Sequence, residues 1–233
     1  MKPFQAIVFD FDGTLAQTME DHFRAWQAVM AEYGIHLAPE DYYPLEGVKV
    51  AELPRRFFAK HHQPPRDEEA LVSKKEQYYL AHHSFAFYPG VEDLIRRLHE
   101  KRVPIAVVTA GLLDRLRHSV PPGFLEQFSA IVSGEDTQEG KPSPEPYLRG
   151  AEKLGVRPEA CLVVENAPIG IESAKRAGAY CIALCTTVPR QELRQADEVL
   201  ETFADLQHAP LIRTLLQSAN GHFPLGTARQ GER

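Results

Sequence analysis

Short, continuous apolar runs recur along the chain and alternate with longer segments whose apolar residues follow a helical period. A run that is apolar at every position fits a strand covered on both faces, as in a parallel sheet. Helices between such strands carry the chain back to the start of the sheet. The runs that we interpret as strands lie at 5–9, 104–109, 130–133, 161–165 and 180–184. The alternation therefore predicts an α/β protein with a doubly wound parallel sheet.

One segment between the third and fourth runs carries clear helix boundary signals. Ser143 is typical of an N-cap, Pro144 of a first turn, and Gly155 of the residue that ends a helix. Apolar residues at helical spacing lie between these boundaries: Tyr147, Leu148, Ala151 and Leu154. The segment is therefore predicted to form a helix that packs on the sheet.

The alternation stops after the first strand and resumes much later, because the intervening residues hold helical stripes and no convincing strand. Met19, Phe23 and Trp26 begin a stripe that predicts a helix ending at Gly34. A second helix is expected over 67–82. These residues are therefore predicted to form a separate helical module.

We expect this module to be a cap domain over 18–87, inserted into a core domain formed by 1–17 and 88–216. The turn Tyr88-Pro89-Gly90 returns the chain to the core. The end of the chain at 217–233 is polar and aperiodic, which predicts a mobile C-terminal tail.

Composition and charge exclude several classes of protein. No apolar run approaches the roughly 20 residues of a membrane span, and a net charge of −6 gives no broad attraction to nucleic acid. The three cysteines lie in or beside apolar runs and lack the paired spacing of a zinc site. The first residues lack the pattern of a signal peptide, so we expect a cytoplasmic protein, and we expect a monomer.

The hexapeptide DFDGTL, which follows the first apolar run, places two carboxylates in one short loop at Asp10 and Asp12. Ligands of α/β sheets bind at the carboxyl ends of strands. Two nearby carboxylates favour a hard cation such as Mg²⁺. One carboxylate can attack phosphorus while its neighbour moves a proton. The alternative is an acidic loop that caps the following helix.

DFDGTL also resembles the first motif of the haloacid dehalogenase superfamily, specifically of its phosphate-transferring members. A helical insert after this motif, with its segment at 22–26, is similar to β-phosphoglucomutase and the phosphoglycolate phosphatases. The resemblance implies an aspartyl-phosphate on Asp10, proton transfer by Asp12, bound Mg²⁺ and a small phosphorylated metabolite as substrate.

The resemblance assigns two further motifs to later strand ends. Thr109, in VVTAG, matches the second motif, and its hydroxyl and the amide of Ala110 could hold a phosphoryl oxygen. Lys141, in GKPSPEP, matches the third motif and would stabilise negative charge beside Asp10. Taken alone, Thr109 could be a helix N-cap and Lys141 a solvated loop lysine.

The fourth motif is matched at Glu165 and Asn166, with a departure from the family pattern. Most relatives have an aspartate at the position of Asn166, so the amide would bind a cation with one fewer negative charge. The resemblance implies that Asp10, the backbone oxygen of Asp12, and Asn166 hold the metal, with Glu165 binding directly or through water.

Three cap residues are candidates for substrate binding: His22, Glu46 and Lys49. The loop 45–49 is similar to the substrate-specificity loop of the mutases, but the basic residues that would grip a second phosphate are absent unless Lys49 replaces them. Glu46 is equally compatible with a solvent-facing position. His22 flanks an apolar stripe, which also fits a structural role.

These observations favour a Mg²⁺-dependent phosphatase acting on a small phosphorylated metabolite, with pyrophosphate not excluded. A phosphomutase of the β-phosphoglucomutase type is the alternative. A third hypothesis is a catalytically silent phosphate-binding protein, because Asn166 weakens the expected metal site.

Overall fold

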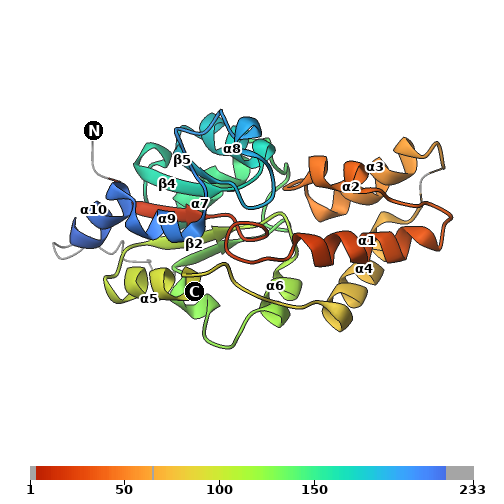
Figure 1. The fold of residues 1–233 in the computed structure, drawn as a ribbon, viewed down its shortest axis with the longest axis horizontal. Coiled ribbons are helices and arrows are strands. Elements are labelled where there is room, and N and C mark those ends of the chain that lie inside the picture. The colour runs from red at the N-terminus through yellow and green to blue at the C-terminus, as the bar shows by residue number, and fades with distance from the viewer. Residues whose placement is uncertain (1–3, 65, 219–233) are drawn as a thin grey trace, which may run out of the picture.

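The computed structural model describes residues 4–64 and 66–218. Figure 1 shows a core built around a sheet and, at one end of it, a group of helices that carries no strand label. All strand pairs of the sheet are parallel, in the order β3-β2-β1-β4-β5-β6. The strands are β1 Ala6–Phe9, β2 Ile105–Val108, β3 Ala130–Val132, β4 Cys161–Glu165, β5 Tyr180–Leu184 and β6 Glu198–Leu200. The predicted doubly wound α/β fold is confirmed.

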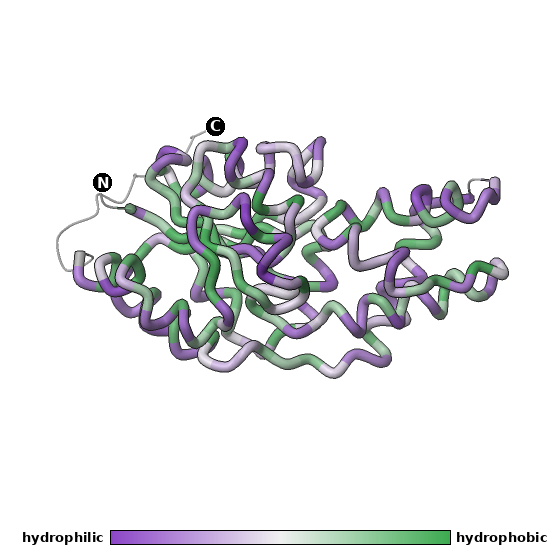
Figure 2. The backbone as a smooth tube through the Cα atoms, turned by 45° about the horizontal axis from the view of Figure 1, so that its top comes forward, coloured by the Kyte–Doolittle hydropathy of each residue, from purple (hydrophilic) through white to green (hydrophobic). Residues whose placement is uncertain are grey.

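Both faces of the sheet are buried, which explains why its central strands are apolar at nearly every position, with Glu165 at the end of β4 as the exception. Ile7 and Phe9 of β1 belong to one core cluster, and Ala6 and Val8 of the same strand belong to the other. Hydrophobic residues follow the strands through the interior of the core in Figure 2. Because successive side chains of a strand point to opposite faces, each strand supplies both clusters.

Helices of the core are divided between these two faces. The first cluster includes residues of α5, α6, α9 and α10, and the second includes residues of α7 and α8. The core helices are α5 Val91–Glu100, α6 Leu113–Ser119, α7 Glu145–Leu154, α8 Pro168–Arg176, α9 Phe203–His208 and α10 Pro210–Ser218. No described helix combines the length and the apolar character needed to cross a bilayer.

The inserted residues form a helical unit with its own apolar core. Trp26 is fully buried and its ring meets that of Phe57 edge-on, at 5.4 Å between centroids. The helices are α1 Met19–Ala31, α2 Pro39–Tyr42, α3 Leu53–Lys60 and α4 Glu68–His82. This unit agrees with the expected cap, and the exact domain limits stay our interpretation.

The two chain segments that join cap and core run side by side. Gln17 N–H donates to the carbonyl of Ala86 at 2.8 Å, and Tyr88 N–H donates to the carbonyl of Leu15 at 3.0 Å. The side chain of Gln17 adds a third bond, from its Nε2 to the carbonyl of Phe87 at 2.8 Å. The cap therefore leaves and re-enters the core at one hydrogen-bonded point.

Several predicted boundaries differ from the structure. The N-cap of α7 is Pro144, and Ser143 lies one residue earlier, where its Oγ accepts from Glu145 N–H at 3.3 Å. Helix α1 ends at Ala31, and Gly34 instead follows in a turn with φ +71°. The first two residues assigned to the tail, 217 and 218, end α10, and the remaining tail residues lie outside the described residues.

Candidate active site

The site lies at the carboxyl edge of the sheet, where strand order reverses. Asp10 directly follows β1, Thr109 follows β2, and Glu165 ends β4. Because β1 pairs with both β2 and β4, these three residues are brought to one edge. Crevices at such reversal points are where open α/β sheets bind ligands. Parallel pairing alone therefore gathers residues that are distant in the sequence.

Asp10 belongs to a buried ionic network with Lys141 and Glu165. Lys141 Nζ donates to Asp10 Oδ1 at 2.6 Å and to Glu165 Oε1 at 2.7 Å. Glu165 Oε1 also accepts from the hydroxyl of Tyr147 at 2.7 Å, and its Oε2 accepts from the N–H groups of Asn166 and Ala167. Both Glu165 oxygens are thus occupied, and the fixed carboxylate orients the ammonium toward Asp10.

Electrostatics of this network follow from its burial. Removal from water raises the pKa of Asp10 to about 7. Lys141 acts to lower this pKa, while the negative charges of Glu165 and Asp12 act to raise it. The pKa of Lys141 is raised, because Asp10 and Glu165 outweigh its own burial. Lys141 therefore stays charged beside the proposed nucleophile, and its 4% exposure excludes the alternative of a solvated loop lysine.

Gly13 gives the loop after β1 the shape that this edge requires. Its φ is +87°, which favours glycine, and a Cβ there would lie 2.3 Å from Asn166 Nδ2. Thr14 Oγ1 donates to Asn166 Oδ1 at 2.7 Å. The loop from β1 and the residue after β4 therefore pack directly against each other.

Glu46 reaches from the cap into this core site and is not solvent-facing. Its exposure is 4%, and Asn166 Nδ2 donates to Glu46 Oε1 and, at 2.8 Å, to Thr187 Oγ1. The other oxygen, Glu46 Oε2, is buried without a partner. Burial raises the pKa of Glu46 to about 8, with Asp10 and Glu165 adding to the shift.

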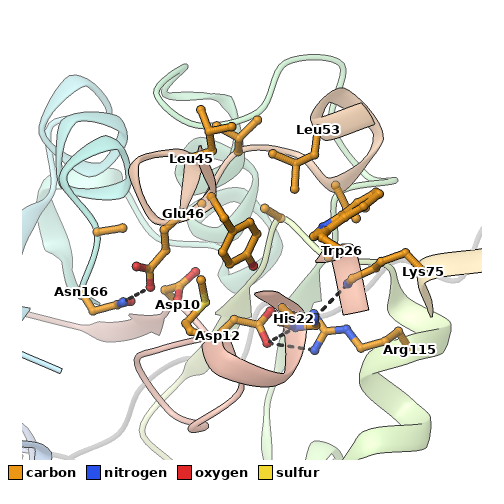
Figure 3. Close-up of a pocket in the computed structure, with 18 of the residues that line it drawn as sticks. Asp10, Asp12, His22, Trp26, Leu45, Glu46, Leu53, Lys75, Arg115 and Asn166 are labelled. Atoms are coloured by element: carbon orange, nitrogen blue, oxygen red, sulfur yellow. Dashed lines mark hydrogen bonds and ion pairs between the residues drawn. The ribbon is translucent and has the colours of Figure 1, made fainter. Parts of the chain in front are cut away.

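Asp12 is held by a different set of partners, on the cap side of Asp10 (Figure 3). Arg115 binds both of its oxygens, with Nη1 to Oδ1 at 3.0 Å and Nη2 to Oδ2 at 2.6 Å. Oδ1 also accepts from Thr18 Oγ1 at 2.7 Å and lies 3.1 Å from His22 Nε2. Burial raises the pKa of Asp12, but Arg115 and His22 outweigh it and hold the pKa well below its ordinary value.

Sequence reasoning missed Arg115, which comes from α6 of the core. The guanidinium lies over the rings of Phe11 and Tyr79, at 5.9 Å and 5.6 Å from their centroids. Gly111 leaves room for it, since a Cβ at this position would lie 2.1 Å from Arg115 Nη2. Arg115 occurs in a short helix with no motif around it, so no pattern in the sequence marks it.

A chain of buried polar groups continues from Asp12 into the cap. His22 Nδ1 lies 2.8 Å from Lys75 Nζ, and Lys75 Nζ donates to Glu76 Oε1 at 3.0 Å. Burial and the nearby charge of Lys75 together lower the pKa of His22 to about 4, although Asp12 acts to raise it. His22 also stacks on Tyr79 at 4.2 Å, so it both packs and contacts the acid. Lys75 follows Leu71 by one helical turn, and a charge on such an apolar stripe was the available signal.

Of the remaining predicted residues, some line the cavity and others do not. Ala110 lines the cavity. Thr109 Oγ1 donates to Asp12 Oδ2 at 3.3 Å and accepts from Gly111 N–H, whereas α6 begins only at Leu113, so Thr109 is not its N-cap. The prediction that Lys49 binds substrate is corrected, because Lys49 does not line the cavity and its Nζ donates to the carbonyls of Thr137 and Gln138.

Cap and core together enclose a cavity of about 50 Å³ over these groups. Asp10 and Asp12 both line it, so the expectation that the two carboxylates share one crevice is confirmed. Apolar and aromatic cap residues form its opposite wall: Met19, Trp26, Tyr42, Leu45, Val48, Val50 and Leu53. The cavity therefore has an ionic floor from the core and a largely apolar roof from the cap.

Whether the donors suit a divalent cation can be tested on the residues present. No three His, Cys, Asp or Glu side chains within 4–64 and 66–218 form a metal-binding group on their own. Counting amide and backbone oxygens, however, Asp10, Asp12 and Asn166 line the same cavity as Glu46, whose Oε2 is buried without a partner. Clustered oxygen donors with uncompensated charge fit a hard cation such as Mg²⁺.

Comparison with known proteins identifies the family of the chain. The family model described as haloacid dehalogenase-like hydrolase matches residues 7–184. Hexitol phosphatase A of Escherichia coli is 31% identical, covering 87% of this chain and 93% of its own. Validoxylamine A 7'-phosphate phosphatase of Streptomyces hygroscopicus is 28% identical, covering 88% and 96%.

Solved structures agree with these relatives. CbbY of Rhodobacter sphaeroides in complex with phosphate has a TM-score of 0.77 at 30% identity, covering 87% of this chain and 96% of its own. A β-phosphoglucomutase of Clostridium difficile has a TM-score of 0.80 at 21% identity, covering 94% and 100%, and shares the fold. The chain is therefore a phosphohydrolase and belongs to the haloacid dehalogenase-like hydrolase family.

Proposed function

We propose that this protein is a Mg²⁺-dependent phosphatase that hydrolyses a small phosphorylated metabolite through an aspartyl-phosphate on Asp10. The observation that carries the proposal is the buried Asp10–Lys141 pair at the reversal point of the sheet. Relatives named as phosphatases of hexitol phosphates and of validoxylamine A 7'-phosphate support the phosphatase assignment. Cytoplasmic location and a monomeric state stay predictions.

In the proposed reaction Asp10 attacks phosphorus, and the bond from phosphorus to the leaving oxygen breaks. Lys141 stabilises the negative charge that develops on the phosphoryl group, and Glu165 keeps its ammonium in place. Water then attacks the aspartyl-phosphate, which releases inorganic phosphate and restores Asp10. The backbone amide of Ala110, at the cavity wall, is available to a phosphoryl oxygen.

Asp12 is proposed to give a proton to the leaving oxygen and to take one from the attacking water. In the structure its carboxylate is bound to Arg115 and His22. Proton transfer therefore requires Asp12 to exchange these contacts for the substrate. Movement of the cap would release the His22 contact, because His22 belongs to the cap. The Arg115 contact lies within the core, so the substrate itself has to displace it.

A magnesium ion would be held by Asp10, the backbone oxygen of Asp12 and Asn166, and Glu46, which lines the same cavity, has a buried oxygen without a partner. When bound, the ion supplies positive charge that neutralises the phosphoryl group. Glu165 is a poorer direct ligand, because four donors already occupy its oxygens. Binding of Glu165 through water suits this arrangement better.

Charge pairing around the cavity favours a phosphatase over a mutase. A mutase must hold a second phosphate, which needs a free cation opposite the reacting group. Arg115 is paired with Asp12, and Lys75 with Glu76. Lys49, the cation that could have replaced the mutase arginine, is bound to core carbonyls. A silent binding protein is the weaker alternative, since Asp10, the proposed nucleophile, and Lys141 are in contact with each other.

The test is phosphate release from a panel of phosphorylated metabolites in the presence of Mg²⁺, comparing the natural protein with Asp10→Asn. We expect turnover only with Asp10 present, and no isomerised phosphate ester as product. Asp93→Asn on the exposed face of α5 is a matched control and should keep full activity. Turnover that survives Asp10→Asn, or accumulation of a rearranged ester, would contradict the proposal.

A further inference from the structure

Glu76 carries a buried carboxylate oxygen that nothing in the proposed reaction uses. Its Oε1 is held by Lys75, whereas its Oε2 is shielded from solvent and has no hydrogen-bond partner. Glu76 is 7% exposed and lines the cavity from α4 of the cap. A buried acceptor without a donor is costly, which points to a donor that arrives with a ligand.

We propose that Glu76 is a specificity-determining residue whose Oε2 accepts a hydrogen bond from a hydroxyl group on the leaving part of the substrate. This inference rests on the proposed phosphatase function. It assigns the substrate to phosphate monoesters with a hydroxylated and otherwise uncharged carbon skeleton.

The charge of the cavity selects a neutral donor. Five carboxylates, Asp10, Asp12, Glu46, Glu76 and Glu165, line it, and the cations in contact with them are Lys75, Arg115 and Lys141. These three cations are already in contact with carboxylates, so none of them is free to receive a second anionic group. A second anionic group on the substrate would be repelled from Glu76, whereas a hydroxyl donates without adding charge.

The cavity that Glu76 lines also offers an apolar wall that suits a carbon skeleton. Trp26, which lines the same cavity, is fully buried in the cap, and the ammonium of Lys75 lies 5.8 Å from its ring centroid. Aromatic rings pack well on C–H groups, and carboxylates accept from hydroxyls. The same cavity thus offers both contacts that a hydroxylated skeleton needs.

Glu76 is also connected to the proposed acid. The contacts Glu76 to Lys75, Lys75 to His22 and His22 to Asp12 are 3.0, 2.8 and 3.1 Å long. A hydroxyl bound at Glu76 therefore contacts a carboxylate that belongs to the same series of polar contacts as Asp12. Recognition of the leaving part and placement of its proton donor share one set of hydrogen bonds.

The experiment compares kcat/KM for two matched pairs of esters in Mg²⁺: sorbitol phosphate with hexyl phosphate, and glucose phosphate with cyclohexylmethyl phosphate, each esterified at its terminal carbon. The natural protein should prefer the hydroxylated member of at least one pair. Glu76→Gln keeps an oxygen for Lys75 and replaces the free acceptor by an amide donor. This preference should fall by about 10- to 100-fold, as expected for losing one hydrogen bond to a charged acceptor.

Glu69→Gln is the matched control, because it makes the same chemical change on the exposed side of α4 and should keep the preference. Should Glu76→Gln fail to fold by its melting curve, Glu76→Asp, which withdraws the carboxylate, should lower the preference too. Equal losses on both members of a pair, or an unchanged preference, would overturn the role of Glu76. If the natural protein releases phosphate from no ester at all, the phosphatase function itself fails.

Discussion

Asp10 and Asp12 stand two positions apart and experience opposite surroundings. The pKa of Asp10 is raised to about 7 by burial, while Arg115 and His22 hold the pKa of Asp12 well below its ordinary value. Two carboxylates whose environments differ so strongly are suited to different tasks. Lys141 and a cation are needed to make Asp10 an anion, whereas Asp12 needs to lose Arg115 before it can hold a proton.

Changing Asn166 to aspartate tests the proposed cation site. Asn166→Asp adds a negative charge beside Glu46 and removes the N–H groups that Nδ2 donates to Glu46 and Thr187. Without Mg²⁺ the variant should melt at a lower temperature, and it should bind Mg²⁺ more tightly. Calorimetric titration and melting curves with and without Mg²⁺ measure both effects. Unchanged affinity would remove Asn166 from the proposed ligands.

Asp136 gives a prediction on stability and pH. Its Oδ2 accepts from the N–H and Oγ of Ser133 at 2.7 and 3.0 Å, and Lys153 lies 3.2 Å from Oδ1. Burial raises the pKa of Asp136, but these bonds outweigh it, so the pKa is lowered from 3.8. A lowered pKa in the folded state means that the stabilisation is present above pH 3.8 and is lost as the pH falls below it.

Asp136→Asn should therefore cost about 1 kcal/mol of unfolding free energy at neutral pH. The difference from the natural protein should shrink as Asp136 of the natural protein becomes protonated. Urea unfolding at a series of pH values measures it. Asp114→Asn, at an exposed position of α6, is the control and should show a smaller cost. A gap that widens in acid would contradict the sign.

How far sequence reasoning reached into the site depends on where each residue lies. Asp10, Lys141 and Glu165 follow or end elements in a fixed order, so their positions mark them before any coordinates are known. Arg115 and Glu76 lie inside helices, and only packing of α4 against α6 brings them to the same cavity. Contacts made by tertiary packing leave no spacing pattern in the sequence.

Among the elements, the central strands were predictable because burial on both faces makes them apolar up to their carboxyl ends. β6 was missed for the opposite reason. It is three residues long, begins with Glu198 and is only half-buried at the edge of the sheet, where one side lacks a partner strand. Such a strand is specified by pairing with β5 and not by its own pattern.

The turn between β2 and α6 gives a prediction at this scale. Gly111→Ala places a methyl group where Arg115 Nη2 now lies, at 2.1 Å, so Arg115 must move away from Asp12. Turnover should fall by about 10-fold or more, because Arg115 orients the Asp12 carboxylate at the cavity before that contact is exchanged for the substrate. In the Arg115→Ala variant, the further change Gly111→Ala should alter turnover little, because the side chain that the methyl group displaces is already absent. Additive losses in this double-mutant cycle would show that Gly111 acts elsewhere.

At the scale of the whole molecule, Lys49 ties the cap to the core. Its Nζ donates to the carbonyls of Thr137 and Gln138 at 2.7 and 3.3 Å, in the loop that leads to Lys141. Gly140 accommodates its stem, since a Cβ there would lie 2.3 Å from Lys49 Cγ. This lysine therefore holds the loop 45–49 against the segment that carries Lys141.

Lys49→Met keeps the stem and removes both bonds to the core. Amide hydrogen exchange in 45–50 should become faster, while exchange in β1 and β4 should stay unchanged, because the sheet does not depend on the cap contact. Hydrogen-exchange mass spectrometry measures both regions. Lys60→Met, on the far helix α3, is the control. Equal exchange in the loop of both variants would mean that other contacts fasten the cap.

The paired segments at Gln17 and Ala86 have a consequence for how such a protein can be rebuilt. Their backbones are already one hydrogen bond apart, so the gap left by deleting everything between them is short enough for a two-residue turn. Cap domains of other shapes could be inserted between these two segments without altering β1, the strand that Asp10 follows. The strand that leads to Asp10 and the helical cap are thus separate pieces of one polypeptide, joined at this hydrogen-bonded point.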